Sequence, residues 1–435
     1  MWTDHLHNAL RSLKRGPVLT LLIVLALGLG IGACMTTLTV YRVLAADPIP
    51  GKSQRLFDVQ IDAGDLVGYQ PGEEPQQQLT RFDAETLLGE RRALRQTMSS
   101  GAFLAVQLAG SSERPEVESA RYATSDFFAM FNAPLAFGSA WNAQQDQEKA
   151  RVVVIGATLN ERLFGKGQSG VGKDLILRGQ QFRIVGVLKP WRLEPFFIDL
   201  SMGAYGRQDQ VFLPFSTAMD LKFAFSGNMN CWGELGSRGP LDRGVPCSWV
   251  QYWVELERPG DAPAFKQYLE RYSEQQRTAG RFVRATNVRL RDVVSHLEHH
   301  QVLPQEVRLQ TSLAFGFLLV CLVNMAGLML AKTLRRSNEI GVRRALGASR
   351  ITVFMQFLVE SVLVGAIGAV LGLLLSQLGL WLVRQSPTQY AHLAEMDTQI
   401  LLLTLAGGVL AALVAGLLPA WRAAGVSPAS QIKVQ

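Results

Sequence analysis

The stretch G-P-V-L-T-L-L-I-V-L-A-L-G-L-G-I-G-A-C-M-T-T-L-T-V-Y, residues 16–41, contains no charged side chain. A helix needs about 20 apolar residues to cross the hydrocarbon core of a bilayer, so this stretch is long enough to span one. Three further uncharged runs have the same property: Leu309–Ala331, Ser361–Val383 and Thr398–Trp421. A lone span in lipid must satisfy its own backbone hydrogen bonds, which favours helices. The sequence therefore predicts four transmembrane helices, over residues 18–41, 309–331, 353–384 and 398–421.

The distribution of charge supports a membrane protein. Only 18% of the 435 residues are charged, against about 25% in a typical soluble protein. The net charge of +7 lies entirely in residues 1–40 and 311–435, which hold 12 basic and 5 acidic side chains, whereas residues 41–310 are neutral. Basic, apolar ends around a neutral middle do not fit a nucleic-acid partner. Four cysteines exclude a disulfide-dense scaffold and a Cys-rich zinc array.

Lysine and arginine near the span ends predict the orientation, because cytoplasmic loops are enriched in both residues. Basic side chains precede the first span, fill the segment between the second and third, and follow the fourth: Arg11, Lys14, Arg15, Lys332, Arg335, Arg336, Arg343, Arg344, Arg350, Arg422 and Lys433. Residues 385–397 contain none. We therefore expect an N-terminal helix over 1–17, the segment 332–352 and the tail 422–435 in the cytoplasm. The segments 42–308 and 385–397 are expected outside, in the periplasm.

The N-terminal run has two other interpretations. It could be a cleaved signal peptide, or a lipoprotein signal ending at Ile31-Gly32-Ala33-Cys34. Its uncharged length exceeds a signal-peptide core of about 7–15 residues, which favours a retained span.

Small residues suggest where spans touch. Gly28 and Gly32 in the first span, and Gly368 and Gly372 in the third, have the four-residue spacing that lets helix backbones approach closely. The competing interpretation is that glycine is simply common in membrane helices. Glu360 lies at the start of the third apolar run. An ionisable residue there can be functional, but a solvated helix end is at least as good an interpretation.

Residues 42–308 predict a water-facing α/β domain. Strands are expected at Phe57–Ile61, Val152–Ile155, Arg183–Leu188, Trp249–Leu256 and Arg281–Arg289, and helices at Arg81–Arg95, Leu159–Phe164 and Ala262–Gln276. The first and last units resemble each other, so two halves at about 50–98 and 245–290 are expected to flank an insertion at about 100–240. Cys231 and Cys247 bound a Gly- and Pro-rich loop outside the cell, where an oxidising compartment favours a disulfide over two free thiols. Closing that loop would contribute about 3 kcal/mol in the chain-entropy model.

Two motifs look like ligand sites and fail closer inspection. Gly167–Asp174 nearly matches the nucleotide-binding P-loop motif, but Asp174 is at the position where a Ser or Thr hydroxyl would hold Mg²⁺. His296, His299 and His300 share a probable helix over 291–301, yet no matching Cys or carboxylate pattern accompanies them, so a solvated juxtamembrane helix is expected there. No catalytic arrangement and no metal site stand out in the sequence.

The segment R-R-S-N-E-I-G-V-R-R-A-L-G-A-S-R, residues 335–350, predicts a compact basic helix between the second and third spans. Glu339 and Arg343 have the favourable i,i+4 order, Gly347 can end the helix, and Ser349 can cap the next one. A topology-setting loop, or one that contacts anionic lipid, is the alternative.

The run from Arg336 to Glu360 resembles the signature of FtsX-like permeases of the MacB type. The C-terminal G-L-L-P-A-W-R-A-A-G-V-S-P-A, residues 416–429, is similar to that family's closing pattern, and residues 127–186, with V-V-V-I-G, R-L-F-G, V-G-K and I-V-G-V, resemble the MacB periplasmic domain. Asn8–Leu13 before the first span also fits. Asn338 and Trp421-Arg422 depart modestly from the pattern.

This resemblance implies a fold and a function. The fold would be four transmembrane helices with a large MacB-type periplasmic α/β domain inserted between the first and second. The function would be that of a permease subunit of a type VII ABC transporter in the bacterial inner membrane, not itself an enzyme. Its coupling helix would contact a separate cytoplasmic ATPase through Glu339, Ile340, Gly341, Arg343, Arg344, Leu346 and Gly347. The absence of a usable P-loop, and a start 15 residues before the first span, favour an ATPase on another chain.

The resemblance also implies partners. ATP and Mg²⁺ would be held by that ATPase and not by this chain. A second permease copy or a paralogue would complete the membrane unit, and membrane lipid would surround it. A periplasmic adaptor and an outer-membrane channel could join it for export. Two alternatives are a non-transporting FtsX-like transmitter that regulates a periplasmic partner such as a cell-wall hydrolase, and a lipoprotein-extracting Lol-type permease.

Overall fold

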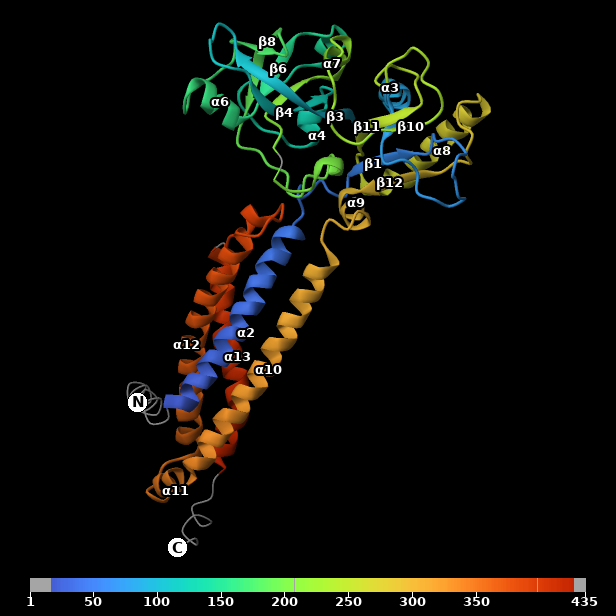
Figure 1. Ribbon diagram of the computed structural model, residues 1–435. Coiled ribbons are helices and arrows are strands. Elements are labelled where there is room, and N and C mark those ends of the chain that lie inside the picture. Colours follow the sequence, from blue (N-terminus) through green and yellow to red (C-terminus); the bar gives the residue numbers. More distant parts are fainter. Residues whose placement is uncertain (1–16, 207, 397, 426–435) are drawn as a thin grey trace. The chain divides into compact units, whose positions relative to one another are not determined.

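The computed structural model describes residues 17–206, 208–396 and 398–425. The predicted helix over 1–17 and most of the tail 422–435 lie outside these residues. The chain divides into two compact units (Figure 1): one runs up to Ala45 and resumes at Leu303, and the other comprises Ala46–Val302.

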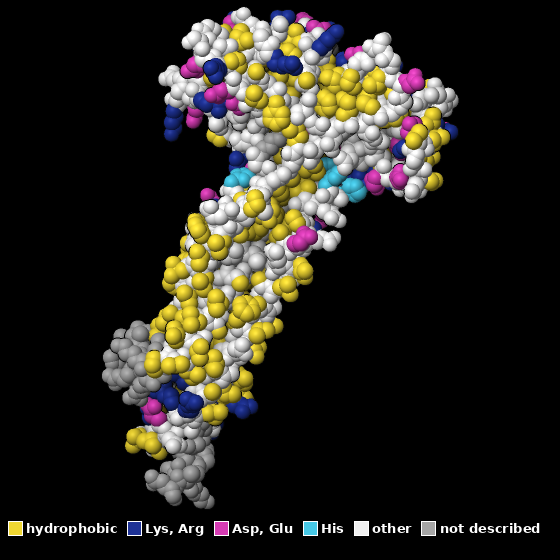
Figure 2. Space-filling view, viewed as in Figure 1, with side chains coloured by type: hydrophobic (Ala, Val, Ile, Leu, Met, Phe, Trp, Pro, Cys, Tyr) yellow, Lys and Arg dark blue, Asp and Glu magenta, His cyan; other side chains and the backbone are white. Residues whose placement is uncertain are grey.

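The first unit is helical, and in its described residues four helices are long and apolar enough to cross a membrane. They are α2 (Pro17–Leu44), α10 (Gln305–Arg335), α12 (Arg350–Arg384) and α13 (Thr398–Ala424). The short α11 (Ser337–Ala345) joins α10 to α12, and a 3-10 turn, η3 (Ala391–Leu393), precedes α13. The helices extend beyond the uncharged runs, since the polar residues next to these runs are helical too. Figure 2 shows hydrophobic side chains covering this unit along its length.

Apolar side chains from all four long helices meet in one core. It includes Ile23 and Leu27 of α2, Met325 of α10, Val364 of α12 and Ala412 of α13. Helix α12 packs along both α2 and α13, so it is the central element of the unit.

The second unit is built on a sheet whose described strands run in the order β12-β1-β11-β3-β4-β9-β6-β8-β5. The strands along this path have the following bounds: β1 (Leu56–Ile61), β3 (Arg95–Leu108), β4 (Glu116–Ala123), β5 (Leu135–Gly138), β6 (Val152–Ile155), β8 (Gln180–Leu188), β9 (Val211–Pro214), β11 (Cys247–Glu255) and β12 (Val288–Asp292). Beside them lie β2 (Leu79–Thr80), β7 (Asp174–Leu177) and β10 (Asn230–Cys231).

Helices accompany this sheet at several places. They are α3 (Arg81–Glu90), α4 (Phe127–Met130), α5 (Ala143–Gln147), α6 (Ala157–Phe164), α7 (Phe215–Asp220), α8 (Ala262–Thr278) and α9 (Val293–His299), with two 3-10 turns, η1 (Leu200–Met202) and η2 (Pro259–Asp261). Two hydrophobic cores fill the unit. One surrounds Trp249 and Tyr252, and the other surrounds Phe127, Phe212 and Trp253.

Two expected boundaries in this unit were wrong, and a third falls where a strand changes its pairing partner. The helix expected to reach Arg95 ends at Glu90, since Arg91 adopts a left-handed conformation with φ 48°, and Arg95 begins β3. The last strand covers Val288–Asp292 instead of 281–289. The expected break near residue 100 falls inside β3, whose first part pairs with β11 and whose longer remainder pairs with β4. One strand therefore belongs to both the flanking halves and the insertion.

The structure joins Cys231 and Cys247 in a disulfide. The two cysteines are direct cross-strand neighbours on β10 and β11. Cys34 and Cys321 are free and buried in the helical unit. The disulfide therefore closes the Gly- and Pro-rich loop onto a central strand of the sheet.

The P-loop-like segment and the three histidines lie in unremarkable surroundings. Gly167–Asp174 forms turns between α6 and β7, with φ 77° at Gly167 and 82° at Gly172, and leads into a strand where a P-loop leads into a helix. The histidine helix, expected to be solvated, is exposed on one side and buried on the other. His296 is buried, with its ring 5.3 Å from that of Trp253, and burial lowers the pKa of His300 to about 4. In the described residues no group of three His, Cys, Asp or Glu side chains could hold a metal ion.

Candidate functional site

Helix α11 is short, and both of its ends are defined by local chemistry. Ala345 is its last residue, and Gly347 follows with φ 101°, a conformation that glycine adopts without strain. The Ser349 hydroxyl then accepts a hydrogen bond from the Thr352 amide at 3.2 Å and caps α12. The chain thus reverses direction between α10 and α12, and α11 is the helix that connects them.

One face of α11 packs onto the ends of the spans. Ile340 is buried in a cluster with Val353 and Phe357 of α12 and with Ala420 and Ala423 of α13. Gly341 beside it is also buried. Displacement of α11 would therefore disturb contacts with two membrane helices, which is what a mechanical connection requires.

The charged side chains of α11 form bonds within the chain. Arg343 pairs with Glu339 at 2.7 Å and donates to the Gln356 Oε1 atom at 3.2 Å. Arg344 donates to the Ala424 carbonyl oxygen at 3.4 Å. Arg336 contacts Glu339 at 3.3 Å. Arg343 and Arg344 thus connect α11 to α12 and α13, whereas Glu339 pairs with Arg343 and Arg336 beside it.

Two apolar side chains are exposed on the outward side of α11 and directly after it. Val342 is 59% exposed and Leu346, directly after the helix, is 83% exposed, with Gly347 exposed beside it. Val342 and Leu346 are four residues apart, so they lie on the same side of this turn of chain. Leu346 is among the predicted contact residues because of its place in the motif, whereas Val342 is not. If Ile340 is taken as buried, the helical repeat places Val342 on roughly the opposite side of the helix. That spacing could have identified Val342 as an exposed apolar residue.

A buried ion pair joins α10 to α12 close to α11. Lys332, in the last turn of α10, contacts Glu360 of α12 with 2.5 Å between Nζ and Oε1, and these residues are 7% and 1% exposed. Lys332 also donates to the Thr20 hydroxyl of α2 at 3.3 Å, and an Arg336 nitrogen lies 4.0 Å from Glu360. The interpretation of Glu360 as a solvated helix end was therefore wrong, because three helices enclose it. The pairing of Lys332 with Glu360 cannot be predicted from the sequence, since no local spacing connects them.

The four predicted glycines lie together where α2 meets α12. A Cβ atom on Gly28 would come 2.8 Å from Leu371, and one on Gly32 would come 2.8 Å from Leu375 and 3.3 Å from the Gly372 carbonyl. Cβ atoms on Gly368 and Gly372 would lie 2.7 Å from side-chain atoms of Leu27 and Ile31 of α2. These contacts leave no room for a side chain, as close packing of membrane helices requires.

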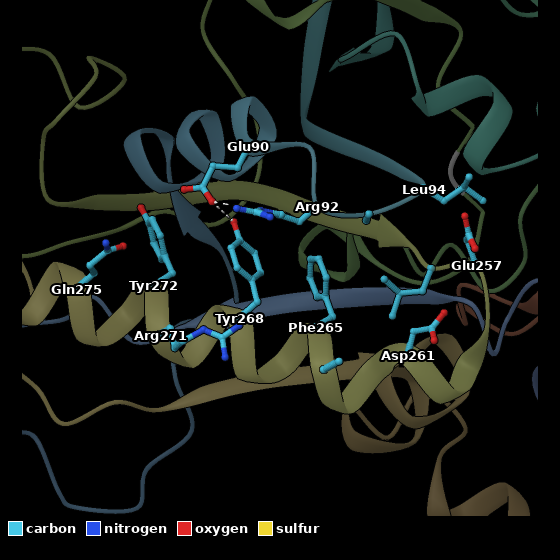
Figure 3. A pocket seen from close by; sticks show the side chains of 13 residues that line it. Glu90, Arg92, Leu94, Glu257, Asp261, Phe265, Tyr268, Arg271, Tyr272 and Gln275 are labelled. Carbon is cyan, nitrogen blue, oxygen red and sulfur yellow. Dashed lines mark hydrogen bonds and ion pairs between the residues drawn. The ribbon is translucent and has the colours of Figure 1, made fainter.

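A groove in the α/β unit lies between the end of α3 and helix α8 (Figure 3). Tyr268 donates a hydrogen bond to Glu90 at 2.8 Å, and Arg92 lies 5.8 Å from the centre of the same ring. Burial, with the neighbouring Glu90 carboxylate, raises the pKa of Tyr268. Acidic, basic and aromatic side chains line this groove. Glu90, Tyr268 and Arg92 already interact with one another.

Two family models together match most of the chain. The MacB-like periplasmic core domain matches residues 20–272, and the FtsX-like permease C-terminal domain matches residues 311–428. The chain belongs to the MacB/FtsX-like family of ABC transporter permeases. This confirms the resemblance and the fold class, with four membrane helices and a large α/β domain of periplasmic type after the first.

Relatives of this MacB-like permease include proteins named for export. It is 25% identical over 388 residues to the macrolide export ATP-binding/permease protein MacB of Marinobacter nauticus, covering 86% of this chain and 52% of that protein. It is 24% identical over 311 residues to the pyoverdine export ATP-binding/permease protein PvdT of Pseudomonas entomophila, covering 69% of this chain and 41% of that protein. The chain thus spans about half the length, or less, of these relatives. Its apolar helices and its family make it an inner-membrane protein.

Two solved structures are similar to part of this chain. The periplasmic region of MacB from Actinobacillus actinomycetemcomitans aligns with a TM-score of 0.37 and 11% identity, over 59% of this chain and 97% of that one. The extracellular domain of the transporter YknZ from Gram-positive bacteria aligns with a TM-score of 0.36 and 15% identity, over 54% and 99%.

Proposed function

We propose that this MacB-like permease carries motion from a cytoplasmic ABC ATPase to its periplasmic domain and so drives export of a substrate. The observation that carries the proposal is the construction of α11, which is buried on one face against α12 and α13 and exposes Val342 and Leu346 on the other. Such a helix can receive a partner and pass its displacement to the spans. ATP and Mg²⁺ would be bound by the partner.

The assembly that we propose contains two permease chains, identical or paralogous, and one ATPase for each. Export is favoured over regulation of a cell-wall hydrolase or extraction of lipoproteins, because the relatives above are named as export proteins. A periplasmic adaptor and an outer-membrane channel would then carry the substrate onward. With these partners, both termini and α11 would lie in the cytoplasm.

Affinity purification of the full chain from its own cells tests the proposal. In mild detergent, mass spectrometry should find an ABC-type ATPase retained at about one copy per permease chain. Retention of a cell-wall hydrolase without any ATPase would instead support the regulatory alternative and overturn the export proposal.

Cysteine labelling tests the orientation. Cys34 and Cys321 are buried and Cys231 and Cys247 are bonded, so the natural chain should react weakly with an impermeant maleimide. In intact spheroplasts we expect Gln389→Cys, at an exposed position between α12 and α13, to be labelled, whereas Arg335→Cys, exposed at the end of α10 next to α11, should react only after permeabilisation. Labelling of Arg335→Cys from outside would place α11 in the periplasm and exclude an ATPase there.

A further inference from the structure

A groove lies between the start of α12 and the end of α13, apart from the exposed surface of α11. Its lining residues are Arg350, Ile351, Phe354, Trp421, Arg422, Ala424 and Gly425, and its volume is about 570 Å³. Every lining residue is basic, apolar or glycine, so the groove contains two positive charges and no negative one. Its charge is complementary to an anion.

The two arginines differ from those of α11 and from Arg336 directly before it. Arg336, Arg343 and Arg344 are engaged in the contacts described above. In the described part of the chain, neither Arg350 nor Arg422 makes an ion pair or a side-chain hydrogen bond. Two guanidinium groups on one groove, both with free donors, are suited to a phosphate, which accepts charge-assisted bonds from arginine.

The groove also has an apolar side that continues into the membrane-spanning part of α13. Trp421 is 70% exposed and Ile351 is 72% exposed. Residues spaced by four, three and four positions form one exposed stripe along α13 that ends at Trp421: Leu410, Val414, Leu417 and Trp421. Tryptophan favours the boundary between headgroups and acyl chains, and Trp421 lies at the end of the fourth uncharged run.

We propose that this groove binds one anionic phospholipid. Arg350 and Arg422 hold the headgroup phosphate, Trp421 lies at the level of the glycerol, and an acyl chain follows the stripe on α13. An acyl chain explains why the apolar stripe is continuous with the basic groove, whereas a soluble phosphate would use only the arginines. The inference does not depend on an ATPase partner.

Native mass spectrometry of the full chain in detergent tests the site, with phosphatidylglycerol and phosphatidylcholine of identical acyl chains as probes. We expect tighter binding of one phosphatidylglycerol. An arginine near an anionic headgroup contributes about fivefold in affinity, so Arg350→Gln with Arg422→Gln should weaken that first binding event about 25-fold. Trp421→Ala should weaken both lipids. Arg335→Gln is the matched control, because Arg335 is an exposed arginine at the same end and does not line the groove.

Four outcomes would overturn the proposal. Unchanged binding of phosphatidylglycerol to the double variant would show that the arginines hold no headgroup, and an equal loss in Arg335→Gln would show a diffuse charge effect. Displacement of the lipid by excess glycerol 3-phosphate would indicate a site for soluble phosphate. Normal lipid binding together with loss of a copurifying protein in the double variant would make the groove a protein contact.

Discussion

Replacing Leu346 with aspartate should release the ATPase from the purified permease while the chain remains folded in the membrane. Leu346 is 83% exposed, so the change costs the isolated chain little. In a complex, burial of a leucine side chain contributes about 1.5–3 kcal/mol, and an unpaired carboxylate in the same place adds a desolvation penalty. The affinity should therefore fall by more than about 100-fold. Retention of the ATPase during affinity purification, measured against the amount of permease, reports the loss.

Leu346→Met is the matched control, because methionine keeps the size and apolar character of the side chain. It should retain the ATPase normally. Charge reversal at Arg343 and Arg344 is a weaker test, because both side chains bond within the chain and their loss would also loosen α11. If Leu346→Asp retains the ATPase as the natural chain does, the exposed apolar surface of α11 is not the contact.

Removing the Glu360 carboxylate should give the largest loss of stability in the helical unit. Glu360→Ala leaves the Lys332 ammonium group buried without its 2.5 Å partner, and breaking a buried ion pair in this way costs about 3–5 kcal/mol. Replacing both partners with apolar side chains of similar size, Lys332→Met and Glu360→Leu, should recover most of that loss, because neither charge then remains buried. Thermal unfolding of Lys332→Met, Glu360→Leu, their double variant and the natural chain in one detergent gives the coupling energy, with Glu360→Ala measured beside them.

Glu339→Ala provides the comparison, since it removes a carboxylate of a partly exposed i,i+4 pair that is worth only about 0.3–0.5 kcal/mol. Its unfolding midpoint should stay close to that of the natural chain. Equal midpoints for Glu360→Ala and Glu339→Ala would contradict a buried, structurally important ion pair. A double variant as unstable as Glu360→Ala would show that packing around the pair, and not its charge, holds the helices together.

The local elements of the α/β unit could be predicted only in part. Val152–Ile155 and the helix beginning at Ala262 were correct, because their periodicity and flanking turns are local signals. Strand β3 was missed. Its sequence from Arg95 to Leu108 mixes polar and apolar residues, and it becomes a strand because β11 and β4 supply its hydrogen bonds. Polar residues such as Thr97 and Ser99 are buried there, which no alternating pattern reveals.

The four membrane helices, the position of the α/β domain after the first of them, and the family follow from the order of the amino acids alone. Length, absence of charge and motif spacing are properties of contiguous residues, and the bilayer permits few structures for such segments. How the charged and exposed side chains are used depends on the packing of the folded chain. It buried Glu360 against Lys332, engaged the arginines of α11 within the chain, and left Leu346, Arg350 and Arg422 facing outward. Those outcomes depend on contacts between helices that are distant in sequence, where the energy of a charge depends on its neighbours and not on its position in the chain.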